Sequence, residues 1–283
     1  MANREHLALL QQGAVTWLEW RSSYVQIVPD LSAANLCGAN FRGANLTKAN
    51  LKRANLDRAK LIAANLCGAN LSAASLCEAE LIDANLQKAE LVDAQLISAQ
   101  MMGADLAYAN LIGADLRGVD LKAADLSHAN LTAAEFIGAT LSEADLSVAK
   151  LSRASLVYAN LTGANFSHAN LSSANLYEAE AIATYFYRAN LCQANLSEAH
   201  FGGAYLFGAD LSAAELYLTD LRWTNLSKVN FTNANLIRAD LRGANLSRAI
   251  FIGANLTEAK LDGANLSKAI FQGAIMPDGK VFR

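Results

Sequence analysis

Long apolar runs, prolines and paired cysteines are all scarce in this sequence of 283 residues. Asn, Asp, Ser or Lys interrupts the chain every few positions, so no apolar run is long enough to predict a transmembrane helix. The four cysteines show no Cys-x-x-Cys spacing, which argues against a disulfide framework and against a zinc site. The N-terminus lacks the basic segment and the cleavage site of a secretory signal, and this favours a cytoplasmic protein.

Charge of one sign and catalytic motifs are scarce as well. The chain has 23 Lys and Arg against 26 Asp and Glu, a net charge of −3 that predicts no strong attraction to nucleic acid. There are only four histidines, and His128 and His168 are predicted to lie about 10 Å apart, too far to share a metal ion. The sequence contains no phosphate-binding loop and no nucleophile elbow. We therefore expect surface histidines and no catalytic residue, cofactor or metal site.

A five-residue repeat is what the sequence contains in place of these features. Repeats of the form Ala-(Asn/Asp)-Leu-x-x run from Ala34 to the one centred on Phe271, which makes 48 repeats without an insertion or deletion. The first slot holds Ala in 43 repeats, the central slot holds Leu in 38, and neither ever holds a charge. Two of every five side chains are therefore predicted to lie in the interior.

The period of five matches neither an α-helix nor a plain strand, so the backbone must turn a corner in each repeat. Of the 17 glycines, 14 lie two residues after the central residue, where a turn can use a positive φ. Pro29 and Pro277 lie just outside the repeats. The pattern predicts a solenoid built from short extended segments and corners.

These repeats resemble those of the pentapeptide-repeat protein family, and the resemblance covers roughly residues 31–276. It implies an all-β right-handed quadrilateral β-helix, a solenoid in which four consecutive repeats form one square coil. On this basis the chain would form about 12 coils, on the order of 58 Å long. Phe231, Phe251 and Phe271 recur at every fourth repeat, as stacking of like side chains on successive coils would favour.

Both ends of the repeats look protected, as a stack with open edges requires. We divide the chain into an N-terminal helical cap and leader (1–30), the solenoid (31–276) and a closing segment (277–283). Trp17 and Trp20 are predicted to cover the first coil. The leader from Gly13 and the ending GAIMPDGKVF resemble those of cyanobacterial members, the ending that of the heterocyst-regulating member. The apolar pattern of the cap comprises Leu7, Leu10, Val15, Trp17, Leu18 and Trp20.

A coil of four repeats assigns each repeat to one of four faces. Face one is centred on Leu36, face two on Phe41, face three on Leu46 and face four on Leu51, each together with every fourth repeat that follows. Face one carries eight acids, three arginines and a column of apolar residues, which either favour strand stacking or bind a protein. Face three carries a column of basic residues, which we interpret as a solvated face in preference to a nucleic-acid site.

Residues 177–223 depart from the repeat. Ala181 stands in a Leu slot, and Thr184, Thr219 and the nearby Thr224 stand in Ala slots. Aromatic residues also fill outward positions, where they either bind a partner or pack on one another to fill the slack left by Ala181. The candidate partner-binding residues are Tyr177, Tyr185, Tyr187, Tyr205, Phe207, Tyr217, Leu218 and Trp223.

Three functions from different classes remain open. The leading prediction is a non-enzymatic protein-protein interaction module or scaffold in a bacterial and cyanobacterial-type cytoplasm, with an unidentified protein partner. The leader and the ending suggest a regulatory role for it. The alternative, which the family resemblance implies, is a DNA mimic that binds DNA gyrase. The third is an enzyme or ligand carrier, which would require a pocket that the sequence does not predict. About a dozen residues follow Phe271, too few for a dimer helix, so a monomer is favoured.

Overall fold

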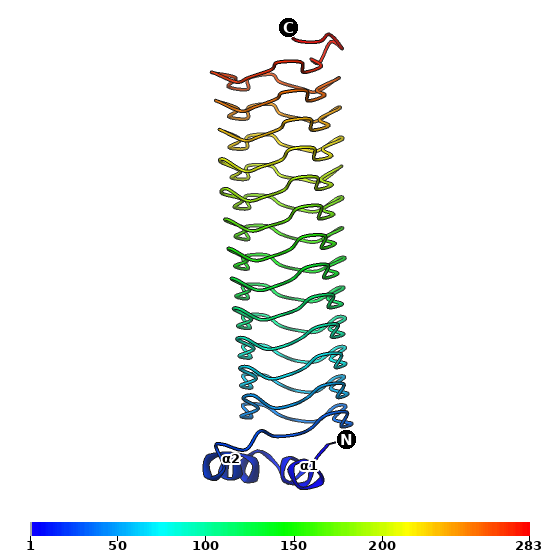
Figure 1. Ribbon diagram of the computed structural model, residues 1–283, viewed down its shortest axis with the longest axis vertical. Coiled ribbons are helices and arrows are strands. Elements are labelled where there is room, and N and C mark those ends of the chain that lie inside the picture. Colours follow the sequence, from blue (N-terminus) through cyan, green and yellow to red (C-terminus); the bar gives the residue numbers. More distant parts are fainter. Residues whose placement is uncertain (1) are drawn as a thin grey trace. The chain divides into compact units, whose positions relative to one another are not determined.

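The computed structural model describes residues 2–283 (Figure 1). The chain divides into two compact units, Met1–Thr140 and Leu141–Arg283. Two helices, α1 (Arg4–Gln11) and α2 (Ala14–Ser23), lie in the first unit. In the rest of the described chain the regular structure consists of turns joined by single β-bridges. No helix among residues 2–283 is long and apolar enough to cross a membrane.

The bridges show that each coil is built from four repeats and has four sides. Parallel bridges join equivalent residues of every fourth repeat, and one occurs at every fifth residue, as in Asn45↔Asn65 of the first unit and Tyr185↔Tyr205 of the second. Each bridge is flanked by backbone hydrogen bonds, such as that from the Leu36 N–H to the Asn55 carbonyl at 2.7 Å. Figure 1 shows the successive coils of each unit stacked on one another. Equivalent side chains four repeats apart therefore lie above one another, on adjacent coils.

Each slot of the repeat has a physical role in the coil. The Ala and Leu slots are buried along most of both units and form the core, whereas those of the last coil, such as Leu261 and Leu266, are partly exposed. The side chain of the Asn or Asp slot points outward, and its oxygen accepts a hydrogen bond from the backbone N–H two residues later. Asn65 Oδ1, for example, accepts from the Cys67 N–H at 3.0 Å. This local turn satisfies the backbone where the chain bends into the next side. The sequence pattern thus encodes the corner as well as the core.

The corner residue, two after the central Leu, adopts a positive φ throughout. The glycines do so as predicted, for example Gly38 at 65°, and non-glycine residues at the same position do so too, for example Lys48 at 58° and Arg188 at 52°. A left-handed conformation costs a non-glycine residue about 1–2 kcal/mol. The Arg188 N–H donates to the Phe207 carbonyl at 3.0 Å, and bonds of this kind offset the cost.

The helices contact the first coil through Trp17 and Arg21. The Trp17 ring is fully buried and its Nε1 donates to the Asn45 carbonyl at 2.8 Å, while Arg21 Nη2 donates to the Thr47 carbonyl at 3.2 Å. Trp20 is half-buried and packs on Trp17, with ring centroids 5.1 Å apart. The apolar pattern divides between α1 and α2, which leaves Val15 exposed.

One prediction about the cap is wrong. His6 was expected at the surface but is buried, and its Nδ1 accepts the Asp30 N–H at 3.0 Å. The Asn3 N–H donates to the Asp30 carbonyl at 2.9 Å, so two bonds join the start of α1 to the beginning of the repeats. The imidazole of His6 therefore has a structural role.

The last residues fold back on the end of the second unit. Ile275 and Val281 form an antiparallel bridge, and the Phe282 ring lies 5.6 Å from that of Phe271. Phe271 itself continues the interior stack with Phe251, at a ring distance of 4.9 Å. This closing turn protects part of the final coil.

Candidate functional site

Four surface aromatic residues of the second unit form two short stacks on face three. The rings of Tyr185 and Tyr205 lie 4.9 Å apart and within 5° of parallel, and those of Tyr187 and Phe207 lie 5.7 Å apart and within 11°. Tyr185 is 47% exposed, Tyr205 is 46% exposed and Tyr187 is 39% exposed. We call these four residues the aromatic ladder. The coil produces it, because like residues at equivalent positions of adjacent coils must stack.

His168 and Lys228 cover the two ends of the second stack. The His168 ring meets Tyr187 edge-on at 5.3 Å, and Lys228 Nζ lies 5.1 Å from the Phe207 ring centre. Arg188 Cζ lies 5.3 Å from the ring centre of Tyr187. Cation–π contacts of this kind hold the charged groups against the ladder. Within the described chain, the hydroxyls of the three tyrosines have no hydrogen-bond partner.

The interior beside Ala181 is packed by other residues than the ladder. Phe186 occupies the central slot of the repeat after Ala181, and Phe201 lies one coil after Ala181 in the same slot as that alanine. Both rings are fully buried, and their centroids lie 5.4 Å apart. The backbone hydrogen bonding is undisturbed there, since the Ala181 N–H donates to the His200 carbonyl at 2.7 Å. The ladder rings pack on one another, as one of the two interpretations of residues 177–223 predicts, but they do so on the outer surface of the coil. They therefore do not fill the slack left by Ala181.

The eight candidate residues do not form one patch. The ladder accounts for four of them, whereas Tyr177, Tyr217 and Leu218 lie on face one and Trp223 lies at the corner after face two. The Tyr177 hydroxyl donates to Glu198 at 3.3 Å, and the carboxylates of Glu178 and then Glu198 raise the pKa of that phenol. Arg238 donates to the Tyr217 hydroxyl at 3.5 Å. Tyr177 and Tyr217 are thus half-buried and engaged with charged neighbours.

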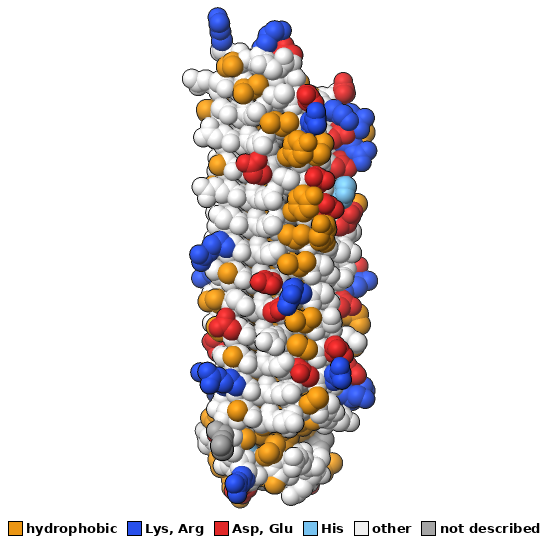
Figure 2. Space-filling model, turned by 90° about the vertical axis from the view of Figure 1, so that its right-hand side faces the viewer, with side chains coloured by type: hydrophobic (Ala, Val, Ile, Leu, Met, Phe, Trp, Pro, Cys, Tyr) orange, Lys and Arg blue, Asp and Glu red, His pale blue; other side chains and the backbone are white. Residues whose placement is uncertain are grey.

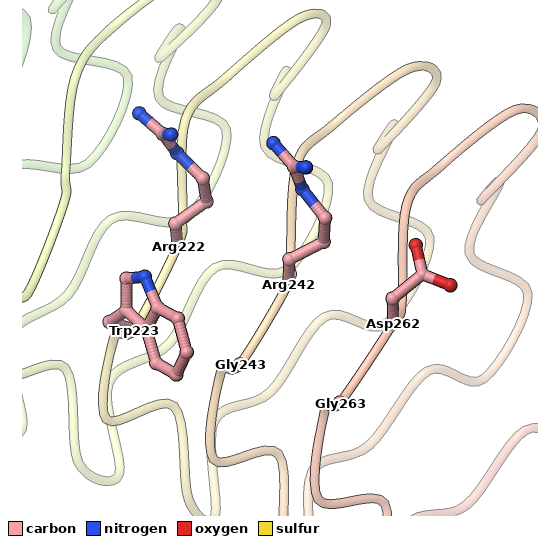
Figure 3. Close-up of a pocket in the computed structure, with 6 residues that line it drawn as sticks. All are labelled: Arg222, Trp223, Arg242, Gly243, Asp262 and Gly263. Carbon is pink, nitrogen blue, oxygen red and sulfur yellow. The ribbon is translucent and has the colours of Figure 1, made fainter.

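Trp223 borders a shallow trough on face two (Figure 3). Its indole is 76% exposed and lies over the backbone of Gly243, where any Cβ would overlap the ring. Gly263 leaves the next corner without a side chain, so the trough continues beyond the indole. Figure 3 shows Arg222, Arg242 and Asp262 in a row beside it.

The arginines of this row are already neutralised. Arg222 binds Asp220 through two hydrogen bonds of 2.8 and 2.6 Å, and Arg242 binds Asp240 in the same way. The hydrogen bonds from the arginines lower the pKa of both carboxyls. The trough therefore presents an indole beside two neutral ion pairs and the carboxylate of Asp262.

The three arginines of face one each pair with a carboxylate of the same face. Figure 2 shows hydrophobic side chains gathered in columns between charged groups on the surface. On face one, Arg58 pairs with Glu78 at 3.0 Å, Arg117 with Asp115 at 2.6 Å and Arg238 with Glu258 at 2.7 Å. These exposed pairs contribute little stability, but they cancel charge locally.

The basic residues of face three were interpreted from the sequence as a solvated face. The structure separates Arg188 and Lys228 from the others, because these two lie on ladder rings. The signal in the sequence was an aromatic residue directly before a cation, as in Tyr187 and Arg188. Among the described residues, no group of His, Cys, Asp and Glu could hold a metal ion.

Comparison with known proteins agrees with the repeat. A family model described as pentapeptide repeats matches successive segments that begin with 30–61 and end with 249–278. The chain belongs to the pentapeptide-repeat family. The fold of this family is the right-handed quadrilateral β-helix, which the parallel bridges of both units match.

Solved structures of pentapeptide-repeat proteins resemble the chain to different degrees. HetL, a protein involved in heterocyst differentiation regulation from the cyanobacterium Nostoc sp. strain PCC 7120, is 34% identical. The match covers 88% of this chain and 95% of HetL, with a TM-score of 0.50. QnrB1, a plasmid-mediated fluoroquinolone resistance protein, is 18% identical over 68% of this chain and 88% of its own, with a TM-score of 0.37. No curated protein sequence matches the chain.

Proposed function

We propose that this pentapeptide-repeat protein is a non-enzymatic protein-interaction module whose docking surface is the aromatic ladder. The observation that carries the proposal is an exposed double stack of aromatic rings that the interior does not need. Tyrosine is a preferred anchor residue in protein interfaces, because a large rigid ring gives much contact area for little loss of side-chain entropy.

Stacking prepares the ladder for binding. Each ring is held by its neighbour one coil away, so a partner would meet side chains that are already ordered. The exposed edges and free hydroxyls offer both apolar contact and hydrogen bonds. A standard interface covers about 800 Å² per partner, and half-exposed rings supply only part of it. The ladder would thus be the centre of an interface that extends over neighbouring coils.

The test is a comparison of two variants of the tagged full-length chain. Tyr187→Ala combined with Phe207→Ala removes one stack, and Tyr108→Ala removes an exposed tyrosine of the same face in the first unit. Proteins from a cyanobacterial lysate that bind the natural chain should be lost from the ladder variant and retained by the control. Identical bound proteins in all three samples would show that the ladder is not the docking surface.

We further propose a regulatory setting in a bacterial, cyanobacterial-type cytoplasm and a monomer of about 12 coils. Its support is the 34% identity to HetL, a cyanobacterial protein involved in the regulation of heterocyst differentiation. Light scattering of the purified chain would test the monomer, and fractionation of a host that carries it in tagged form would test the cytoplasmic location.

Gyrase binding by DNA mimicry has less support. B-DNA carries a charge every 1.7 Å or so, which corresponds to roughly three charges per coil. Face one has only eight acids in all, and Arg58, Arg117 and Arg238 pair with three of them. We expect micromolar protein to leave the supercoiling activity of gyrase unchanged.

A further inference from the structure

The corner column of face three in the second unit carries four cations without a carboxylate. Within residues 141–283, none of them has an Asp or Glu oxygen within ion-pair distance. Face three there has a single acid, Asp145, whose oxygen already accepts from the Asn165 side chain at 3.0 Å and the Ser147 N–H at 2.9 Å. The four cations are Arg188, Lys228, Arg248 and Lys268.

The arginines of two other faces are paired with carboxylates. The arginines on faces one and two of the second unit are Arg222, Arg238 and Arg242. Each of them holds a carboxylate at 2.6 or 2.7 Å. The arginines of these two faces are therefore neutralised by carboxylates, whereas the four cations of the face-three corner column are not.

The uncompensated charge adjoins the ladder. Arg188 and Lys228 contact the rings of Tyr187 and Phe207, and Arg248 and Lys268 follow Lys228 at steps of one coil. Apolar ring edges and free positive charge thus form one continuous surface. Electrostatic complementarity selects partners of the opposite charge and suppresses those of the same charge.

From this surface we infer that the occupant of the ladder is an acidic protein segment that also carries apolar or aromatic side chains. The inference rests on the proposed function and names the chemistry of the partner. The apolar side chains contact the edges of the ladder rings, and the carboxylates meet Arg188 and Lys228 first and Arg248 and Lys268 beyond them.

Single-stranded nucleic acid is the other polyanion that aromatic and basic residues can bind, and the ring geometry disfavours it. Bases stack on the open faces of aromatic rings. In the ladder those faces are turned toward each other at 4.9 and 5.7 Å, and Lys228 covers the far side of Phe207. The edges that remain exposed suit a protein better than a nucleobase.

A random peptide library selected against the full-length chain tests the inference. We expect selected peptides to be enriched in Asp and Glu together with apolar residues. Arg188→Glu combined with Lys228→Glu should weaken binding of a selected peptide at least tenfold in fluorescence anisotropy. Lys88→Glu, in the same column of the first unit, should leave it within twofold. Raising NaCl from 0.05 to 0.5 M should also weaken binding to the natural chain.

The outcomes separate this inference from the proposed function. If Tyr187→Ala with Phe207→Ala abolishes peptide binding but the charge reversal does not, the ladder is a docking surface and the acidic partner is refuted. If neither variant affects binding, both proposals fail. Selected peptides without acidic residues, peptide binding that depends on Trp223 alone, or tighter binding of a thymidine oligonucleotide than of any peptide would each overturn the acidic partner. Arg188→Gln with Lys228→Gln provides a milder variant, and circular dichroism checks that every variant is folded.

Discussion

The repeats of the first unit and those of the second share an interior and differ in their surface. Both bury Ala and Leu and turn their corners with the same side-chain-to-backbone bond. Among residues 31–140, Tyr108 is the outward aromatic residue, and it stacks on His128 at 4.6 Å. The second unit instead presents the ladder and Trp223. The difference shows that the two units share the interior and the corners of the coil, whereas their outward side chains vary.

Removing an interior ring should have the largest effect. Phe186→Ala deletes a fully buried ring that packs against Phe166 at 5.0 Å and Phe201 at 5.4 Å. We expect the free energy of unfolding to fall by about 3–5 kcal/mol in urea denaturation. Tyr187→Ala, one residue further along, removes an exposed ring and should cost less than about 1 kcal/mol. Equal losses in the two variants would contradict the division between interior and surface.

Gly243→Ala should have the next largest effect. Alanine at a φ of 68° is strained, and its Cβ would overlap the Trp223 indole. We expect a loss of about 1–2 kcal/mol and a changed tryptophan emission, because the ring must leave the backbone. Gly203→Ala, at a φ of 67° with no atom within 4 Å, isolates the backbone cost. If both variants have the same spectrum, Trp223 does not rest on Gly243.

A smaller loss is expected for Thr184→Val. Thr184 is buried in an Ala slot, and its Oγ1 donates to the Leu161 carbonyl at 2.7 Å. Valine keeps the shape and removes the hydroxyl, so stability should fall by about 1 kcal/mol. Thr232→Val is the control, because Thr232 is an outward residue that bonds Asn230. A variant as stable as the natural chain would show that the hydroxyl is dispensable.

Loss of the ion pairs Arg222–Asp220 and Arg242–Asp240 should have the smallest effect on stability. Hydrogen bonds from Arg222 and Arg242 lower the pKa of Asp220 and Asp240 in the folded chain. Their contribution is therefore present above the unfolded pKa of about 3.9 and is lost as the pH falls through the folded values. Because the pairs are partly exposed, we expect less than about 1 kcal/mol for the two together. Asp220→Asn with Asp240→Asn should flatten the acid side of the stability profile, and an unchanged profile would contradict the assignment.

Much of the fold could be predicted, because every repeat follows the same physics. The Leu and Ala slots identify the core, and Phe231, Phe251 and Phe271 reveal the step of four repeats, which their stacking at 5.0 and 4.9 Å now explains. The burial of His6 could not be predicted, because it depends on how α1 meets Asp30. The positive φ of Lys48 was also hidden, since its cost is offset by a backbone bond to the next coil.

The candidate site could be predicted only in part. Aromatic enrichment pointed to residues 177–223, but closeness in sequence joined residues that the coil separates, such as Tyr177 and Tyr185. Whether a cation is neutralised depends on whether a carboxylate reaches it, as Asp220 does for Arg222. Spacing alone does not report that contact, so the free cations of face three emerged only from the structure.

The four-sided coil also dictates which insertions and deletions such a protein can tolerate. Removing one whole coil, for example 229–248, would shorten the second unit and leave every later residue on its own face. Removing a single repeat would keep the core pattern intact but rotate all later side chains by a quarter turn. Lys268 would then leave the column of Lys228 without any substitution. A change in the number of repeats can therefore alter which side chains share a binding surface in this fold, while the composition of each remaining repeat stays unchanged.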